Sequence, residues 1–249
     1  MPASYPDLNG KAVYVTGGAT GIGAAIVTAF AQQGARVHFI DIDIEAAKKL
    51  VEETRKHASA SITCELCDAT DNQALQQSVR QFAEEKGIDI LVNNVANDTR
   101  HDLAETTADQ WRAIMAVNLD PAFFASQAAA ALMNNGAIIN LSSINALFGP
   151  QGLIGYNTAK AGLLGLTRSL ASELGEKQIR VNSILPGWVA TERQLALWLK
   201  PEAEAEWQKL TKLKGRIHVE DIANCALFLG SDASRMITGQ QFIVDAGQV

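Results

Sequence analysis

The amino-acid sequence predicts an α/β fold in which a doubly wound sheet of seven parallel strands carries helices on both faces. Short β-branched or apolar runs alternate with amphipathic segments along the whole chain. Several runs are apolar at consecutive positions, as expected of strands covered on both faces. With 249 residues, 47% of them hydrophobic, the chain fits a single domain over residues 1–249.

The expected elements follow one another in a regular order. Strands are predicted over 11–17 ("KAVYVTG"), 36–41 ("RVHFID"), 61–68, 88–94, 137–143, 180–185 and 241–246. Helices, which have apolar residues at a spacing near 3.6, are predicted over 21–33, 43–57, 71–86, 107–133, 156–175 and 219–230. This strand–helix–strand order is typical of a parallel sheet with crossover helices.

The segment 188–214 interrupts this order. It is longer than a usual strand-to-helix connection and carries three of the four tryptophans. Long insertions at the carboxyl ends of strands are commonly lids or substrate-binding loops. We therefore predict a substrate loop or lid here; the alternative is a helical hairpin that packs on the body or on another subunit.

Charge and cysteine content exclude several classes of protein. The net charge of -6 argues against a nucleic-acid partner. The N-terminus shows no leader pattern and no run reaches 18 apolar residues, so we expect a cytoplasmic protein without a membrane segment. Cys64 and Cys67 lie on a predicted strand, where alternation points them to opposite faces. We expect structural cysteines and no metal site.

A glycine-rich turn follows the first predicted strand. "TGGATGIG" (16–23) opens a helix, whose free N–H groups and positive dipole end can bind a pyrophosphate. Asp41 ends the second strand 18 residues beyond Gly23, near the spacing at which a carboxylate accepts hydrogen bonds from an adenosine ribose. Because no Lys or Arg directly follows Asp41, the pattern favours NAD over NADP. A helix N-cap is the alternative role, and Asp43 fits it better.

Tyr156 and Lys160 are spaced to share one helical face. An isolated pair of this kind is usually a solvated surface. A base that removes the proton of a secondary alcohol needs a lowered pKa, however, and a neighbouring ammonium group provides that for a phenol. The pair follows Ser143 by thirteen residues and comes in register with the glycine turn.

Taken in order, "TGGATGIG", "NNVA" (93–96), Asn118, Ser143, "YNTAK" and "PGWVAT" resemble the classical short-chain dehydrogenase/reductase family, from Gly10 to Gly247. The resemblance implies a Rossmann fold. It also implies that Tyr156 is the general acid/base, that Lys160 lowers its pKa and binds the nicotinamide ribose, and that Ser143 holds the substrate oxygen. Asn118 would connect Lys160 to a proton-relay water.

The resemblance also implies an NAD site along the strand ends. Its residues would be Gly17, Thr20, Gly21, Ile22, Gly23, Asp41, Ile42, Asp68, Ala69, Asn94, Tyr156, Lys160, Pro186, Gly187, Val189 and Thr191. Several of these, Pro186 and Gly187 above all, are equally compatible with ordinary strand-end turns. The chain departs from the family at Val95 and Ala96, where N-N-A-G is usual, and at Ala246 in the final D-G-G.

The stretch "NNVANDTRHDL" (93–103) resembles the branch of the family that oxidises aldoses at C1 to lactones. A sugar needs several donors and acceptors in its pocket. The candidate substrate residues are Ser143, Asn145, Gln151, Tyr156, Asn157, Trp188, Asn97 and His101, with Asp98, Arg100 and Glu192 in or beside the same loops. The alternative for each of these residues is that it lies on the surface or stabilises a loop and does not bind the substrate.

Two other activities remain open. One is an NAD-dependent reductase or dehydrogenase of a keto acid, polyol or steroid, and the other is an inactive nucleotide-binding scaffold. The resemblance further implies a homotetramer that pairs the helices predicted over 107–133 and 156–175.

Overall fold

A computed structural model describes residues 3–58 and 60–249. Its seven strands form one sheet in the order β3-β2-β1-β4-β5-β6-β7, and every neighbouring pair is parallel. They are β1 (Ala12–Thr16), β2 (Arg36–Asp41), β3 (Ile62–Leu66), β4 (Ile90–Asn93), β5 (Gly136–Leu141), β6 (Ile179–Pro186) and β7 (Gln241–Val244). The predicted fold class is confirmed.

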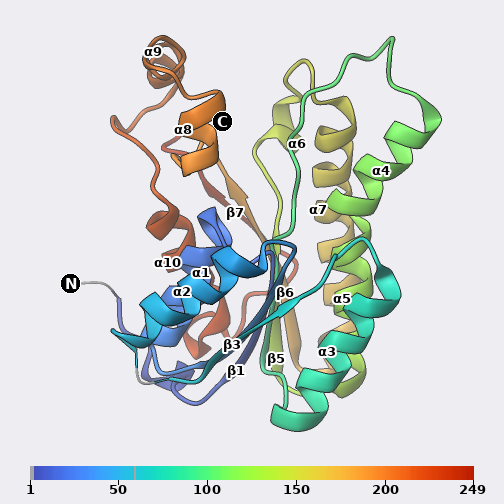
Figure 1. The fold of residues 1–249 in the computed structure, drawn as a ribbon, viewed down its shortest axis with the longest axis vertical. Helices are drawn as coiled ribbons and strands as arrows, with labels where there is room; N and C mark the ends of the chain where they lie inside the picture. The colour runs from blue at the N-terminus through green and yellow to red at the C-terminus, as the bar shows by residue number, and fades with distance from the viewer. Residues whose placement is uncertain (1–2, 59) are drawn as a thin grey trace.

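Helices cover both faces of this sheet (Figure 1). They are α1 (Gly21–Gln32), α2 (Ile44–Arg55), α3 (Asn72–Lys86), α4 (Ala108–Asn118), α5 (Asp120–Leu132), α6 (Asn145–Phe148), α7 (Ile154–Leu174), α8 (Glu192–Leu197), α9 (Pro201–Leu210) and α10 (Val219–Gly230). Helices α1, α2 and α10 lie on one face, and α3, α4, α5 and α7 on the other (Figure 1). No helix in the described ranges is long and apolar enough to cross a membrane.

Alternating side chains of the central strands supply two separate cores. Val13 and Val15 pack with Phe30 on one face, whereas Tyr14 packs with Leu75 on the other. This is the period of two that a strand imposes on its side chains. The same alternation separates the cysteines, because Cys64 contacts the first core and Cys67 belongs to the second.

The helix predicted over 107–133 is two helices. α4 ends at Asn118 and α5 begins at Asp120, with Leu119 between them at φ -129° and ψ -52°. Pro121 has no N–H and cannot donate to the preceding turn, so the helix cannot run through this point. The break sets Asn118 at the end of a helix instead of in the middle of one.

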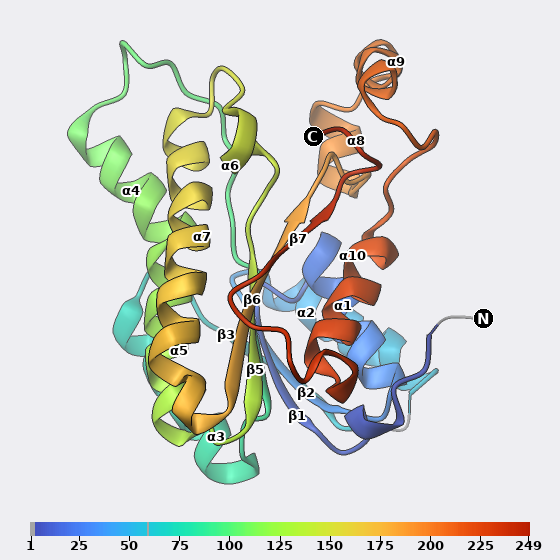
Figure 2. The same cartoon turned by 180° about the vertical axis from the view of Figure 1, so that it is seen from behind.

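The segment 188–214 folds into the short helices α8 and α9 above the carboxyl ends of the strands (Figure 2). Trp207 of α9 is buried and packs edge-on against Trp188, with 6.5 Å between ring centroids. Its indole Nε1 donates to Gln248 Oε1 at 2.8 Å. The insertion is therefore packed on the body through its tryptophans.

Candidate active site

A cavity of about 730 Å³ lies at the carboxyl ends of the strands. Parallel sheets of this kind bind ligands at that edge, where the strand order changes direction. Ser143 follows β5, Tyr156 and Lys160 come from α7, and Pro186 and Trp188 lie at and beyond the end of β6. Residues far apart in the sequence thus line one space.

Lys160 is buried behind Tyr156, with only 1% of its surface exposed. Its ammonium Nζ donates to the carbonyl of Leu141 at 2.7 Å and lies 5.7 Å from the centre of the Tyr156 ring. Ser142 ties the helix to the end of β5, because its hydroxyl donates to Lys160 O at 2.7 Å. Ser142 was not among the predicted site residues, because the family motif includes its neighbour Ser143 and not Ser142 itself.

The acidity of this pair differs from the expectation. The pKa of Tyr156 is raised to about 12, because burial and, to a smaller extent, the charge of Asp98 raise it more than a hydrogen bond with Ser143 lowers it. Burial alone lowers the pKa of Lys160 to about 7. Without a ligand the phenol is therefore less acidic than free tyrosine, because desolvation outweighs any help from a lysine that points to a backbone carbonyl.

Asn118 holds the loop after β4. Its Oδ1 accepts from Asn97 N at 2.8 Å, and its Nδ2 donates to Asn97 O at 3.1 Å and Ile114 O at 3.0 Å. The side chain is thus bound to backbone groups instead of reaching toward Lys160. At the helix break, Ala122 N–H donates to Leu119 O instead of continuing the α-helical pattern through Asn118.

The glycine turn has the geometry that close backbone approach requires. Gly17 and Gly21 have φ of +67° and +56°, a region that favours glycine. A Cβ on Gly23 would lie 2.0 Å from Gly17 O, so only glycine fits there. Asn94 supports the turn from the end of β4, since its Nδ2 donates to Gly17 O at 2.7 Å and Thr16 O at 3.2 Å.

Asp41 lies beside this turn at the end of β2. Its Oδ2 accepts from Ala19 N at 2.9 Å and its Oδ1 from Asp43 N at 3.0 Å. Asp43 is the N-cap of α2, because its side chain accepts from Ala46 N at 3.0 Å. The alternative role of helix N-cap therefore belongs to Asp43.

The remaining predicted cofactor residues fall into two groups. Ile22, Asn94, Tyr156, Lys160, Pro186, Gly187, Val189 and Thr191 line the cavity. The others, Gly17, Thr20, Gly21, Gly23, Asp41, Ile42, Asp68 and Ala69, lie at or beyond the ends of β1, β2 and β3 at the same edge of the sheet. Asp68 accepts from the backbone and hydroxyl of Thr70 at 2.9 and 2.8 Å, and Ile42 is exposed. These positions fit an extended dinucleotide that runs from the cavity toward β3.

Four of the predicted substrate residues line the cavity: Ser143, Asn145, Tyr156 and Trp188. Gln151 is exposed and is not part of the lining. Asn157 donates to Pro150 O at 2.9 Å, and Asn97 Oδ1 accepts from the Thr99 hydroxyl at 2.6 Å. Each of these two side chains thus stabilises a nearby loop.

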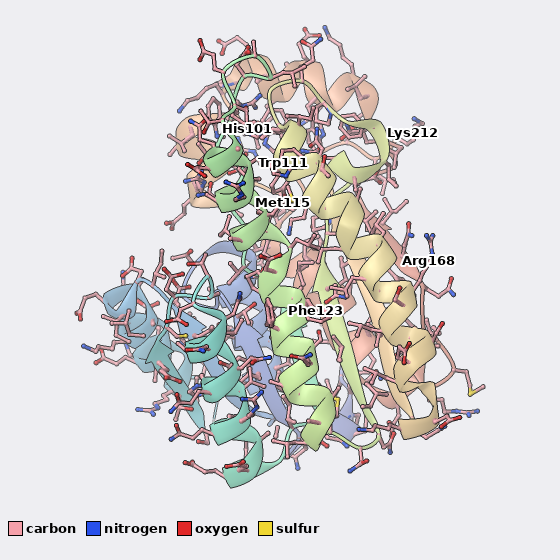
Figure 3. The ribbon with its side chains drawn as sticks, turned by 90° about the vertical axis from the view of Figure 1, so that its right-hand side faces the viewer. His101, Trp111, Met115, Phe123, Arg168 and Lys212 are labelled. Atoms are coloured by element: carbon pink, nitrogen blue, oxygen red, sulfur yellow. The ribbon has the colours of Figure 1, made fainter. Side chains whose placement is uncertain are left out.

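His101 stabilises the start of α7. Its Nε2 accepts from Gly155 N–H at 3.0 Å, and Nδ1 is 3.2 Å from Thr99 O, to which it donates as the Nδ1–H tautomer. This places a neutral imidazole between the loop after β4 and the helix that carries Tyr156 (Figure 3). His101 does not line the cavity.

The cavity lining includes some residues that the sequence indicated and others that it did not. Asp98 and Arg100 line the cavity from the loop after β4, as their position in the motif allowed. Further lining residues come from the insertion and the end of the chain: Gln194, Ala203, Glu206, Trp207, Lys209, Leu210 and Gln248. They become neighbours only through tertiary packing, so no local pattern could indicate them.

The amino-acid sequence is similar to those of known oxidoreductases over nearly its whole length. The family model described as enoyl-(acyl carrier protein) reductase matches residues 17–248. The chain is 42% identical to a probable galactose dehydrogenase of Rhizobium meliloti, over 99% of this chain and 98% of that protein. It is 43% identical to the D-xylose 1-dehydrogenase of Caulobacter vibrioides, over 98% of each.

Solved structures are also similar. A short-chain dehydrogenase/reductase from Serratia marcescens has a TM-score of 0.91 at 34% identity, over 97% of this chain and 99% of that chain. A blue fluorescent protein from a metagenomic library, in complex with NADPH, has a TM-score of 0.90 at 34% identity, over 98% of this chain and 99% of that chain. The chain therefore belongs to the short-chain dehydrogenase/reductase family of oxidoreductases, and its sugar-dehydrogenase relatives support an enzyme that acts on CH–OH donors.

Proposed function

We propose that this protein oxidises the C1 hydroxyl of an aldose to the lactone with NAD⁺, and that Tyr156 is the general base. One observation carries the proposal: Tyr156 and Ser143 line the same cavity as the residues predicted to face the nicotinamide. The similarity to a D-xylose 1-dehydrogenase and a probable galactose dehydrogenase over nearly the whole chain supports a sugar substrate.

In this proposal Ser143 orients the substrate oxygen and Tyr156 removes its proton. The phenol must first become acidic, because its pKa of about 12 in the ligand-free protein leaves it protonated. NAD⁺, when bound, would accept the hydride that leaves C1 of the sugar as the hydroxyl loses its proton, and its positive charge would favour the phenolate. Lys160 lies within the same buried region and can turn its ammonium group from Leu141 O toward a ribose hydroxyl.

In this proposal the proton leaves the phenol of Tyr156 for solvent by way of Lys160 and a relay water near Asn118. Because Asn118 binds the Asn97 backbone with its side chain, we assign the contact with a relay water to its backbone carbonyl at the α4–α5 break. A carbonyl at a helix end lacks its usual partner four residues later and can accept from water.

The preference for NAD over NADP rests on Asp41. Its carboxylate, at the end of β2, would repel a 2′-phosphate, and its two bonds to backbone N–H groups hold it in place. A similar structure binds NADPH, so the cofactor is the part of the proposal that most needs measurement. Comparing NAD⁺ and NADP⁺ as co-substrates, with the wild type and an Asp41→Ala variant, measures it directly.

Polar and aromatic groups together favour a polyhydroxylated substrate. Asp98, Asn145 and Gln194 bring carboxylate and amide groups to the cavity, and the indoles of Trp188 and Trp207 provide flat apolar walls. A sugar ring has hydroxyls at its edge and apolar C–H groups on its faces, so this lining suits it better than it suits a steroid or acyl chain.

We also propose a cytoplasmic homotetramer that pairs helices α4, α5 and α7 of neighbouring subunits. Trp111 and Phe123 are 37% and 42% exposed, and with Met115 they lie along α4 and α5 on the side shown in Figure 3. Exposed aromatic side chains on one face commonly mark protein interfaces. The mass of the purified protein in solution, measured by light scattering, tests this arrangement.

A substrate panel with purified protein tests the proposed function. We expect NADH to form with pentoses, hexoses or deoxyhexoses, and less readily with polyols. Tyr156→Phe should retain NAD⁺ binding and lose most turnover, whereas Tyr5→Phe, at a partly buried position beside Gln33, should behave as the wild type. Reduction of a keto acid, a steroid ketone or another ketone with NADH, without sugar oxidation, would favour the alternative activity. NAD⁺ binding without turnover on any substrate would contradict an enzyme.

A further inference from the structure

The short helix α8 is attached at both ends to the loop after β4. At its start, Asp98 Oδ1 accepts from Arg193 Nε and Nη2 at 3.3 and 3.1 Å. At its end, the guanidinium of Arg100 lies 4.4 Å from the ring centre of Trp198. Two residues of one loop thus hold a helix that is more than ninety positions away in the sequence.

A second contact of Asp98 reaches the cavity wall. Its Oδ2 accepts from Gln194 Nε2 at 2.7 Å, and Gln194 Oε1 accepts from Trp188 Nε1 at 2.9 Å. Asp98, Gln194 and Trp188 all line the cavity. The carboxylate of Asp98 therefore sets the orientation of the Gln194 amide. Only the NH₂ group of the amide can donate to a carboxylate, so the amide oxygen is left to face the Trp188 indole.

The contacts that link Asp98, Gln194 and Trp188 continue to two further residues of the cavity lining. Trp188 packs edge-on against Trp207, whose indole donates to Gln248 near the end of the chain. The wall of the cavity is thus a connected set of side chains, and Asp98 supplies the charge at its start. The side chain of Asp98 is 26% exposed, so its bonds are stronger than those of a freely solvated ion pair.

We propose that Asp98 is a specificity-determining positioning residue, which holds α8 over the cavity and through Gln194 sets the position of the Trp188 indole against the substrate. Because α8 and the Trp188 indole form one wall of the cavity, we expect a monosaccharide to be oxidised more readily than a larger aldose. This inference rests on the proposed function for its substrate, but the attachment of α8 can be measured without any turnover.

The first experiment measures closure in the ligand-free protein. Trypsin cleaves after Arg193, which lies at the start of α8, whereas Lys200 is followed by Pro201 and is not a cleavage site. We expect Asp98→Ala to increase the cleavage rate after Arg193 at least about tenfold, because the loss of even one charge-assisted hydrogen bond corresponds to about tenfold and Asp98 accepts three bonds. Asp102→Ala is the matched control, because Asp102 lies in the same loop and its carboxylate binds the nearby backbone of Ala104. Backbone hydrogen exchange over residues 191–200 should likewise be faster in Asp98→Ala than in the wild type and in the Asp102 control.

The second experiment exchanges donor and acceptor. Asp98→Asn removes the charge, and Gln194→Glu places two carboxylates together, so each should raise KM for the sugar about tenfold or more with a smaller change in kcat. The double variant D98N/Q194E should recover most of this loss, because the carboxylate introduced at position 194 can accept from the amide introduced at position 98 and still accept from Trp188 Nε1. A reducing disaccharide should gain activity relative to its monosaccharide in Asp98→Ala.

The charge of Asp98 also leaves a signature in the pH profile. Because Asp98 raises the pKa of Tyr156, Asp98→Asn should move the rise of kcat to lower pH, and Asp102→Asn should not. Wild-type cleavage rates in Asp98→Ala, or additive losses in D98N/Q194E, would overturn the proposal even if sugars are oxidised. Faster cleavage without sugar turnover in any variant would support the attachment of α8 and overturn the proposed function instead.

Discussion

Replacing Lys160 by methionine should raise the free energy of unfolding at pH 6 relative to its value at pH 9. Burial lowers the pKa of Lys160 from 10.5 to about 7, because the charged ammonium is only 1% exposed and its one described partner is the neutral carbonyl of Leu141. A group whose pKa is lowered on folding destabilises the folded state below that pKa. The penalty disappears as the pH rises toward the value of the unfolded chain.

The magnitude follows from these two pKa values. Each pKa unit corresponds to about 1.4 kcal/mol, so the penalty is on the order of 5 kcal/mol at pH 6, where Lys160 is charged in both states. At pH 9 the folded state holds a neutral amine, and the penalty falls to about 2 kcal/mol. Methionine has a similar length and no charge. The gain in the free energy of unfolding should therefore be about 3 kcal/mol larger at pH 6 than at pH 9.

Urea unfolding of the wild type and Lys160→Met at both pH values measures this difference. The lost bond to Leu141 O costs about 1–3 kcal/mol and offsets part of the gain at both pH values, so the test is the difference between pH 6 and pH 9. Lys177→Met is the control, because Lys177 also donates to a carbonyl, that of Ala130 at 2.8 Å, but is exposed. An equal effect of Lys160→Met at pH 6 and pH 9 would refute the argument that desolvation controls this lysine.

Other predictions concern the glycine turn, the ribose site and the core. In calorimetry, Gly23→Ala should weaken NAD⁺ binding more than about tenfold and destabilise the fold by about 2 kcal/mol or more, because the new Cβ would lie 2.0 Å from Gly17 O. Gly165→Ala, where the space around the glycine is open, should cause neither effect. Asp41→Ala should raise kcat/KM with NADP⁺ relative to NAD⁺, and an unchanged ratio would exclude Asp41 from cofactor choice. Tyr14→Phe should cost about 1–2 kcal/mol in urea unfolding, since Tyr14 forms a buried 2.7 Å bond with Ser78; no loss would mean that water replaces it.

Local patterns predicted the seven strands, most of the long helices and the residues at the strand ends. The strands were evident because those in the middle of a parallel sheet are covered on both faces and are therefore mostly apolar. The glycine turn was evident because close backbone approach at Gly23 excludes every side chain. The break at Leu119 was missed, although Pro121 was present, because the helical periodicity continues through it.

The roles of polar side chains were harder to predict. His101 and Asn157 lie in the right loops, yet the backbone groups of Gly155 and Pro150 occupy their nitrogens. The acidity of Tyr156 was expected to follow from Lys160, but burial governs it in the ligand-free protein. Spacing indicates which residues are close and does not indicate which partner a side chain selects or how much water it loses.

The sequence by itself determined the parallel sheet, the glycine turn and the pairing of Tyr156 with Lys160, since periodicity and chain geometry control each of these over short distances. Only the tertiary structure decided that Asp98 contacts Arg193 and that Trp188 contacts Trp207. The first contact joins segments that follow different strands, β4 and β6, and the second joins two distant parts of the segment 188–214. Their formation depends on packing over the whole sheet, which no local pattern of residues records.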